Sequence, residues 1–205
     1  MTGIFGVTGL PCAGKSVAAH LLAQGVGTGT PGILVKADDI GHRVLETPEV
    51  LDQLVRRFGP DVATTPDAAT RRRIIAEKAF ANPDDLSWLE NLVHPMVYAE
   101  SEKIIEKNRN APVVVETALL FAGRLGELCG IIVLIEADRS VRIARAAARG
   151  WTRDELFRRE ERQIPLYAPH ILAGYAAKLV RVGNDEDDDG LAARLCAALE
   201  RHAHA

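Results

Sequence analysis

Short runs of consecutive hydrophobic residues recur along the chain, and within them hydrophobic positions do not alternate with polar ones. The runs cover residues 3–8, 33–37, 112–116 and 130–137, with a weaker run at 178–182. Runs of this kind are typical of parallel strands that are covered by helices on both faces. The first run ends in a glycine-rich turn, and residues 15–24 then have a helical pattern. Strand, loop and helix in this order open an α/β nucleotide-binding unit.

The segment between the second and third runs is helical in pattern. Hydrophobic residues recur at helical spacing between residues 50 and 58, and residues 70–81 and 85–107 are helical by composition. We expect Pro95 to interrupt the last stretch or to begin a new helix. About 60 residues of helix exceed what a crossover between parallel strands requires. Two interpretations stay open: a substrate-binding insertion, or extra helices that pack on one face of the sheet.

This pattern divides the chain into a core and an insertion. The core is expected to comprise residues 1–48 and 112–205, with a lid at about 141–175, and residues 49–111 form the helical insertion. A last helix is expected to carry Leu191, Leu195 and Leu199 on one face.

The turn after the first run matches the phosphate-loop pattern G-x-x-x-x-G-K-[ST] in full. It reads Gly9-Leu10-Pro11-Cys12-Ala13-Gly14-Lys15-Ser16. The two glycines allow backbone conformations in which successive N–H groups face a phosphate, and the following helix directs its positive N-terminus at the same anion. Lys15 is expected to neutralise charge on the β- and γ-phosphates, and the Ser16 hydroxyl to ligate Mg²⁺. The residues expected to bind ATP in this segment are Gly9, Pro11, Cys12, Ala13, Gly14, Lys15, Ser16 and Val17.

Charged residues near the other runs complete the candidate site. Asp38 follows the second run, at the edge where α/β sheets bind ligands, and is a candidate to orient or deprotonate an acceptor hydroxyl. Its alternative role is to cap a helix that begins near Ile40. Glu116 ends the third run, where it holds Mg²⁺ through water or is structural. Residues 141–164 are rich in arginine, which suits either a lid over phosphates or an exposed helix paired with glutamates.

Composition narrows the class of protein. The net charge of −3 at pH 7 argues against bulk electrostatic binding to nucleic acid or to an anionic membrane. No segment has the roughly 18 consecutive apolar residues of a membrane span, and no signal peptide is evident. Three widely spaced cysteines form neither a zinc pattern nor a disulfide framework, so we expect a cytoplasmic protein. A guanine-reading [NT]-K-x-D segment is missing after the later runs, which argues against a GTP-binding switch.

Further motifs extend over nearly the whole chain. They are T-G-x-x-x-x-G-K-S at Thr8–Ser16, A-D-x-I-x-H-x-V-L at Ala37–Leu45, Phe80–Pro83, Trp88–Pro95, Leu119–Phe121 and Arg159-x-x-x-Gln163-x-Pro165. Together they resemble the motifs of the dephospho-CoA kinases of coenzyme A biosynthesis. The resemblance implies a doubly wound five-stranded parallel sheet with a helical CoA-binding domain and a lid. It also implies transfer of the γ-phosphate of ATP, with Mg²⁺, to the ribose 3′-hydroxyl of dephospho-CoA.

The resemblance assigns roles to individual residues. Asp38 falls on the acceptor-side aspartate of the family, and with Lys15 it is the expected catalytic pair. The residues expected to bind the acceptor substrate are Asp38, Arg72, His94 and Arg159, while Arg145 and Arg149 fall on arginines that enter the lid and bind ATP. His94 has an alternative role, because a histidine before proline can bond backbone at a helix start.

Some positions depart from the family pattern. The family has Asp-Ala-Asp where this chain has Lys36-Ala37-Asp38, and Pro11 removes one N–H from the phosphate loop. The family's carboxylate after the Leu-Leu-Phe motif is replaced by Ala122, and a long segment follows Gln163. Two alternatives therefore stay open: a related kinase for another nucleotide or nucleoside-like acceptor, and a relative that binds ATP without efficient transfer.

Overall fold

The computed structural model describes residues 3–186 and 190–204. The sequence at 185–189 is a run of acidic residues that predicts a solvated loop, and this run lies partly outside the described residues. The chain divides into two compact units, one formed by Met1–Lys36 with Ile104–Ala205 and the other by Ala37–Lys103. The helical unit therefore begins at Ala37, whereas the sequence predicts an insertion that begins at residue 49. Among the described residues, no helix is both long and apolar enough to cross a membrane.

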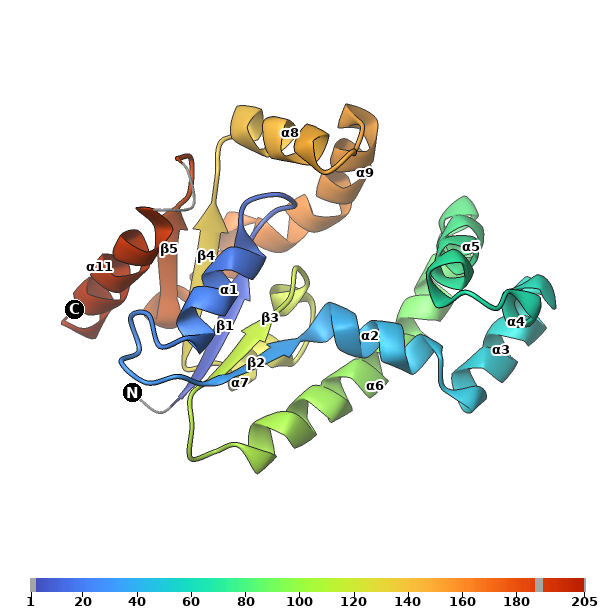
Figure 1. Ribbon diagram of the computed structural model, residues 1–205, viewed down its shortest axis with the longest axis horizontal. Coiled ribbons are helices and arrows are strands. Elements are labelled where there is room, and N and C mark those ends of the chain that lie inside the picture. Colours follow the sequence, from blue (N-terminus) through green and yellow to red (C-terminus); the bar gives the residue numbers. More distant parts are fainter. Residues whose placement is uncertain (1–2, 187–189, 205) are drawn as a thin grey trace. The chain divides into compact units, whose positions relative to one another are not determined.

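The first unit is built on a five-stranded, all-parallel sheet (Figure 1). Its strands are β1 (Ile4–Thr8), β2 (Ile33–Lys36), β3 (Val113–Glu116), β4 (Ile131–Glu136) and β5 (Leu179–Gly183), in the order β2-β3-β1-β4-β5. All five predicted strands are confirmed to within a residue or two. Glu116 is in register with Val7 of β1 and with Lys36 of β2, so the carboxyl ends of the three strands lie level.

Two helices cover one face of the sheet. Helix α1 (Lys15–Ala23) and helix α11 (Leu191–Ala203) bury a cluster of aliphatic side chains against the central strands. Leu191, Leu195 and Leu199 are at most 1% exposed, which confirms the predicted helix face. Full burial of a leucine contributes about 1.5–3 kcal/mol, so these positions fix α11 to the sheet.

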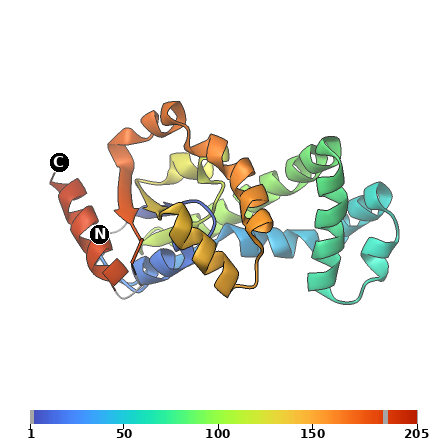
Figure 2. The ribbon, with the colours of Figure 1, turned by 90° about the horizontal axis from the view of Figure 1, so that it is seen from above.

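Short helical segments cover the opposite face (Figure 2). They are η1 (Leu120–Ala122), α7 (Leu125–Leu128), η2 (Ile164–Tyr167), α10 (Pro169–Ala173) and η3 (Ala176–Lys178). The Lys178 ammonium donates to the carbonyl oxygens of Gly126, Glu127 and Cys129 at 2.8, 3.2 and 2.8 Å. These carbonyls lie at the end of α7, where a helix leaves acceptors without partners, so one lysine fastens η3 to α7.

Helices α8 (Arg139–Ala148) and α9 (Arg153–Gln163) form a hairpin within the predicted lid. A buried ion pair joins Arg142 to Glu160, and the Arg142 Nε donates to the Ala137 carbonyl oxygen at 3.0 Å. Thr152 and Glu155 form a capping box at the start of α9. Hydrogen bonds from the backbone and side chain of Thr152 lower the pKa of Glu155. The predicted pairing of arginines with glutamates is therefore partly an interior contact rather than an exposed one.

The second unit consists of α2 (Ala37–Leu45), α3 (Pro48–Phe58), α4 (Asp61–Thr64), α5 (Ala68–Ala81) and most of α6 (Pro83–Lys107). Val50, Leu54 and Phe58 are buried at helical spacing on α3. The Phe58 ring packs edge-on against Trp88, with 5.7 Å between centroids. The predicted helices 50–58, 70–81 and 85–107 are therefore present.

The prediction for Pro95 was wrong, because α6 runs through this residue without a break. A proline inside a helix removes one N–H donor, here the one that would bond to the carbonyl of Asn91. The helix continues because its buried face extends beyond the proline: Val97 and Ser101 are 7% and 0% exposed. The Ser101 hydroxyl also donates to the Val97 carbonyl oxygen at 2.8 Å.

Candidate active site

The phosphate loop joins β1 to α1, and its glycines occupy positions that no other residue fits. Gly9 has φ +151°, and a Cβ there would lie 2.3 Å from the carbonyl oxygen of Ile135 on β4. Gly14 caps α1 with φ +105°, and a Cβ there would lie 2.2 Å from the amide nitrogen of the Asn184 side chain. Both contacts are far inside van der Waals distance. The loop therefore packs against the ends of β4 and β5.

Lys15 and Ser16 begin α1, at the positive end of the helix. The Lys15 ammonium donates to the Leu10 carbonyl oxygen at 3.2 Å, which folds the side chain back over the loop. The Ser16 hydroxyl donates to Oε1 of Glu116 at the end of β3. Oε2 of Glu116 is buried and has no hydrogen-bond partner among the described residues. A hydroxyl and a carboxylate with a spare acceptor are hard oxygen ligands of the kind that Mg²⁺ prefers.

Cys12 links the loop to the α8–α9 hairpin. It is the only non-glycine among the described residues with positive φ, at +62°, and its side chain is 5% exposed. The side chain packs with Ala146 of α8 and Leu156 of α9. This contact makes Cys12 a small packing residue between the loop and the hairpin.

Asn184 is a loop partner that sequence reasoning missed. It follows β5, is fully buried, and its side-chain amide donates to the Ala13 carbonyl oxygen at 3.0 Å. Arg194 donates to its Oδ1 at 3.0 Å, and Arg145 donates to its backbone carbonyl at 2.9 Å. Arg145 also approaches the Ala13 carbonyl oxygen at 3.4 Å. Asn184 thus joins the phosphate loop to α8 and α11, from a position 171 residues away in sequence.

Tyr167 of η2 is a second partner that the sequence did not indicate. Its hydroxyl accepts from the Gly9 N–H at 3.1 Å, contacts the Thr8 hydroxyl at 2.8 Å and donates to the Ala118 carbonyl oxygen at 3.2 Å. Burial raises the pKa of this phenol, so it stays protonated and able to donate at neutral pH. The only sequence signal is a tyrosine in the long segment after Gln163.

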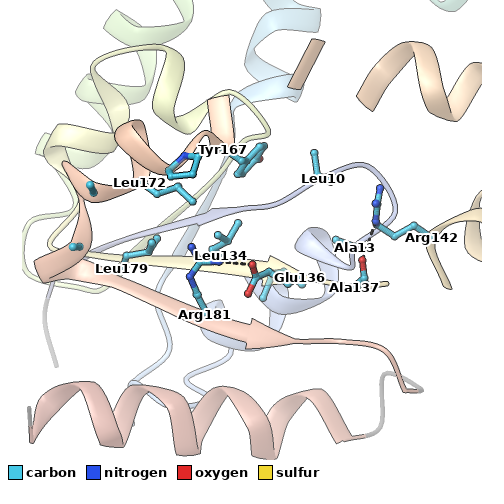
Figure 3. Close-up of a pocket in the computed structure, with 14 residues that line it drawn as sticks. Leu10, Ala13, Leu134, Glu136, Ala137, Arg142, Tyr167, Leu172, Leu179 and Arg181 are labelled. Atoms are coloured by element: carbon cyan, nitrogen blue, oxygen red, sulfur yellow. Dashed lines mark hydrogen bonds and ion pairs between the residues drawn. The ribbon is translucent and has the colours of Figure 1, made fainter. Parts of the chain in front are cut away.

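A cavity of about 610 Å³ lies beside the loop in the first unit (Figure 3). Figure 3 shows Tyr167 and Leu172 on one side of it and Leu134, Leu179 and Arg181 on the other. Leu10 and Ala13 of the phosphate loop line it as well. Apolar side chains predominate, and Arg181 is paired with Glu136 across the two strands at 2.5 Å.

The lid arginines differ in their surroundings. Within the described structure, Arg145 alone of Arg145, Arg149 and Arg159 has a hydrogen bond to the loop. Arg149 caps the C-terminus of α8 and is exposed. The Arg159 guanidinium lies 4.3 Å from the centroid of the Trp151 ring, which keeps it on the surface of the hairpin.

The remaining predicted residues belong to the helical unit. Asp38 is exposed in the first turn of α2, which begins at Ala37. The alternative role as a cap of a helix beginning near Ile40 was therefore wrong. His94 lies inside α6 and faces Tyr98 with 6.0 Å between ring centroids. Its alternative role at a helix start was also wrong, because the helix starts eleven residues earlier at Pro83.

Arg71 and Arg72 of α5 have different degrees of constraint. Arg71 donates to the carbonyl oxygens of Val62 and Thr65 at 3.0 and 2.7 Å and pairs with Glu46. The guanidinium of Arg72, the predicted substrate residue, approaches Oε1 of Glu46 only at 4.0 Å. Arg71 therefore holds the helical unit together, while the Arg72 guanidinium is less tightly held.

Comparison with known proteins identifies the family. The family model described as dephospho-CoA kinase matches residues 3–176. The chain belongs to the dephospho-CoA kinase family. A dephospho-CoA kinase of Leptospira interrogans serovar Lai is 32% identical over 168 residues, which are 80% of this chain and 78% of that protein. For the dephospho-CoA kinase of Borrelia garinii the identity is 30% over 67% of this chain, and the match spans 64% of that protein's length.

Two solved structures have folds similar to that of this chain. TT1252 from Thermus thermophilus is 25% identical, with a TM-score of 0.73 over 98% of this chain and 95% of that one. Thymidylate kinase from Candida albicans is 13% identical, with a TM-score of 0.55 over 98% and 92% of the two chains. The second similarity concerns the fold alone. The predicted fold, a P-loop kinase with a five-stranded parallel sheet, is confirmed.

Proposed function

We propose that the protein transfers the γ-phosphate of ATP to the ribose 3′-hydroxyl of dephospho-CoA, giving CoA and ADP. The observation that carries this proposal is a complete phosphate loop, shaped by Gly9 and Gly14, in a chain of the dephospho-CoA kinase family. A phosphate loop alone serves many reactions. Family membership is what favours dephospho-CoA as the acceptor.

The loop and the start of α1 would bind the phosphates of ATP. Backbone N–H groups of the loop and the helix N-terminus together favour an anion at this position. The Lys15 ammonium donates to the neutral Leu10 carbonyl oxygen, and a charged phosphate oxygen would be a stronger acceptor for it. Lys15 would then stabilise charge that develops on the transferring group.

The residues present fit a magnesium ion. Ser16 and Glu116 meet at the ends of α1 and β3, and the unpartnered Oε2 of Glu116 is an acceptor for a metal-bound water. When bound with ATP, magnesium would neutralise phosphate charge and orient the β- and γ-phosphates. Lys36 is in register with Glu116 on the neighbouring strand, so a cation stands here where the family has an aspartate.

Asp38 would act on the acceptor. It lies two residues beyond the carboxyl end of β2, and its carboxylate is exposed to solvent. A carboxylate that accepts a hydrogen bond from the 3′-hydroxyl would orient this group and receive its proton as the phosphoryl group is transferred. Arg72 and His94 of the helical unit, with Arg159 of the lid, are proposed to bind the acceptor. The cytoplasmic location of the protein stays a prediction.

The test is an acceptor panel. Purified protein with MgATP is given dephospho-CoA, nucleosides or nucleoside monophosphates, and both ADP and phosphorylated product are measured. With MgATP present, we expect rapid ADP release and CoA formation when dephospho-CoA is the acceptor, and no such release with the other acceptors. The Asp38→Asn variant should bind ATP as wild type does but turn over at least about a hundredfold more slowly, the lower end of general-base effects. Equal turnover with another acceptor, or ATP binding without acceptor-stimulated ADP release, would refute the proposal.

A further inference from the structure

The Tyr167 hydroxyl occupies the point at which β1 becomes the phosphate loop. It contacts Thr8, the last residue of β1, and Gly9, the first residue of the loop. Thr8 is fully buried and Gly9 is buried as well. A phenol has one hydrogen to donate and two lone pairs to accept with. The hydrogen goes to the Ala118 carbonyl oxygen, so the Thr8 hydroxyl and the Gly9 N–H both donate to Tyr167.

These bonds give the buried Thr8 hydroxyl and the buried Gly9 N–H an acceptor in the half-buried Tyr167 hydroxyl. Among the described residues, no other hydrogen bond to the Gly9 N–H is present. This N–H is therefore not one of the groups that face a phosphate, and Gly9 shapes the loop instead of cradling the anion. The residue after it, Leu10, supplies the carbonyl oxygen that holds the Lys15 ammonium. A shift at Gly9 would thus pass directly to the acceptor that positions Lys15.

The same part of the chain contacts the loop at other points. Between Arg139 and Tyr167, residues of α8, α9 and η2 contact the loop at Cys12, at the Ala13 carbonyl oxygen and at Gly9. Of these three contacts, the one at Gly9 is a hydrogen-bond network with a single hydroxyl at its centre. That hydroxyl can be removed without changing the shape of the ring.

We propose that Tyr167 is a positioning residue for nucleotide binding: its hydroxyl fixes the start of the phosphate loop and thereby sets the affinity for the phosphates of ATP. This inference rests on the proposed function, since it assumes that the loop binds a nucleotide. The competing explanation is that Tyr167 only stabilises the fold, because its ring packs edge-on against Phe121 with 5.8 Å between centroids.

The test compares Tyr167→Phe with Tyr175→Phe. Tyr175 lies in the same segment and also packs against Phe121, at 4.9 Å between ring centroids. Among the described residues, its hydroxyl has no hydrogen-bond partner. For each protein, calorimetry measures ADP affinity with magnesium, and steady-state kinetics measure the KM for ATP and for dephospho-CoA.

We expect Tyr167→Phe to weaken ADP binding and to raise the KM for ATP about tenfold, because the buried Gly9 N–H loses its acceptor. The KM for dephospho-CoA should stay within twofold of wild type, and Tyr175→Phe should match wild type in both measurements. Thr8→Val removes the hydrogen bond between the Thr8 and Tyr167 hydroxyls while leaving Tyr167 unchanged. This variant should weaken ADP binding about threefold. If Tyr167→Phe does not fold, Thr8→Val alone decides the question.

The outcomes separate the two proposals. If wild type does not bind ADP, the proposed function fails. If wild type binds ADP and Tyr167→Phe melts earlier but binds ADP equally well, Tyr167 is merely structural and the inference is wrong. The inference is also wrong if Thr8→Val leaves ADP affinity unchanged, or if Tyr175→Phe weakens it as much as Tyr167→Phe.

Discussion

Replacing Asn184 by alanine should damage both the stability of the first unit and its nucleotide site. The substitution removes a neutral hydrogen bond to the Ala13 carbonyl oxygen and a hydrogen bond from the Arg194 guanidinium. A neutral bond contributes about 0.5–1.5 kcal/mol and a bond to a charged group about 1.5–3 kcal/mol. The expected loss is therefore about 2–4.5 kcal/mol. For a chain of 205 residues this corresponds to a melting point roughly 5–15 °C lower.

The assay is thermal unfolding with and without ADP and magnesium. The increase in melting point on adding ADP reports affinity for the folded state. This increase should be smaller in Asn184→Ala than in wild type, because the Ala13 carbonyl keeps only the long contact to Arg145 at 3.4 Å. Asn184→Asp offers a sharper comparison. It retains an acceptor for Arg194 but places an oxygen where the donor to Ala13 was, so it should lose ADP affinity more than stability.

Asn108→Ala serves as the control. Asn108 is half-buried at the end of α6, and its side-chain amide donates to the Ile104 carbonyl oxygen at 2.7 Å. This variant should melt slightly earlier and gain as much as wild type from ADP. The reasoning is refuted if Asn184→Ala melts like wild type, or if ADP raises the melting points of Asn184→Ala and wild type by the same amount.

Three further predictions concern parts of the first unit outside the phosphate loop. Lys178→Met should lower the free energy of unfolding by about 2 kcal/mol in a urea titration, since three carbonyl oxygens of α7 lose one charged donor. Glu160→Gln leaves the buried Arg142 charge without its partner and should cost about 3–5 kcal/mol, seen as faster amide exchange throughout α8 and α9. Burial raises the pKa of the Cys129 thiol from 9.0 to about 12, so the unfolded chain releases this proton first and the thiol's contribution to stability falls as pH rises from 9 to 12. Cys129→Ala should therefore show a shallower loss of stability between pH 9 and 10 in urea titrations.

Each of these outcomes has a clear opposite. A wild-type urea midpoint for Lys178→Met would mean that water satisfies the α7 carbonyls equally well. Unchanged exchange rates in Glu160→Gln would show that the ion pair does not hold the hairpin together. Parallel pH profiles for wild type and Cys129→Ala would show that the thiol ionises equally easily in both states.

The sheet could be predicted from the sequence because its strands are continuous hydrophobic runs. Val113, Val114 and Val115 illustrate this, since all three are at most 1% exposed although neighbouring side chains point to opposite faces. The phosphate loop was predictable for a related reason: its constraints are local, and Gly9 and Gly14 are required by backbone angle and close approach.

Contacts between distant parts of the chain could not be predicted in this way. Asn184 and Tyr167 meet the loop across 171 and 158 residues, and neither belongs to a spacing pattern. The prediction of a helix break at Pro95 was wrong for a different reason. The sequence shows that proline removes one helix hydrogen bond, but it does not show the burial of Val97 and Ser101 that offsets this loss. Arg71 and Arg72 are adjacent arginines, and only the folded unit shows that Arg71 is the anchored one.

The three thiols provide a native chemical probe of motion at the nucleotide site. Cys12 is shielded by Ala146 and Leu156, so a thiol reagent reaches it only when the hairpin separates from the loop. Cys129 is buried with a pKa of about 12 and reacts slowly, while the half-buried Cys196 supplies an internal reference on α11. The rate of Cys12 modification relative to Cys196 then measures how often the hairpin opens, without any introduced label.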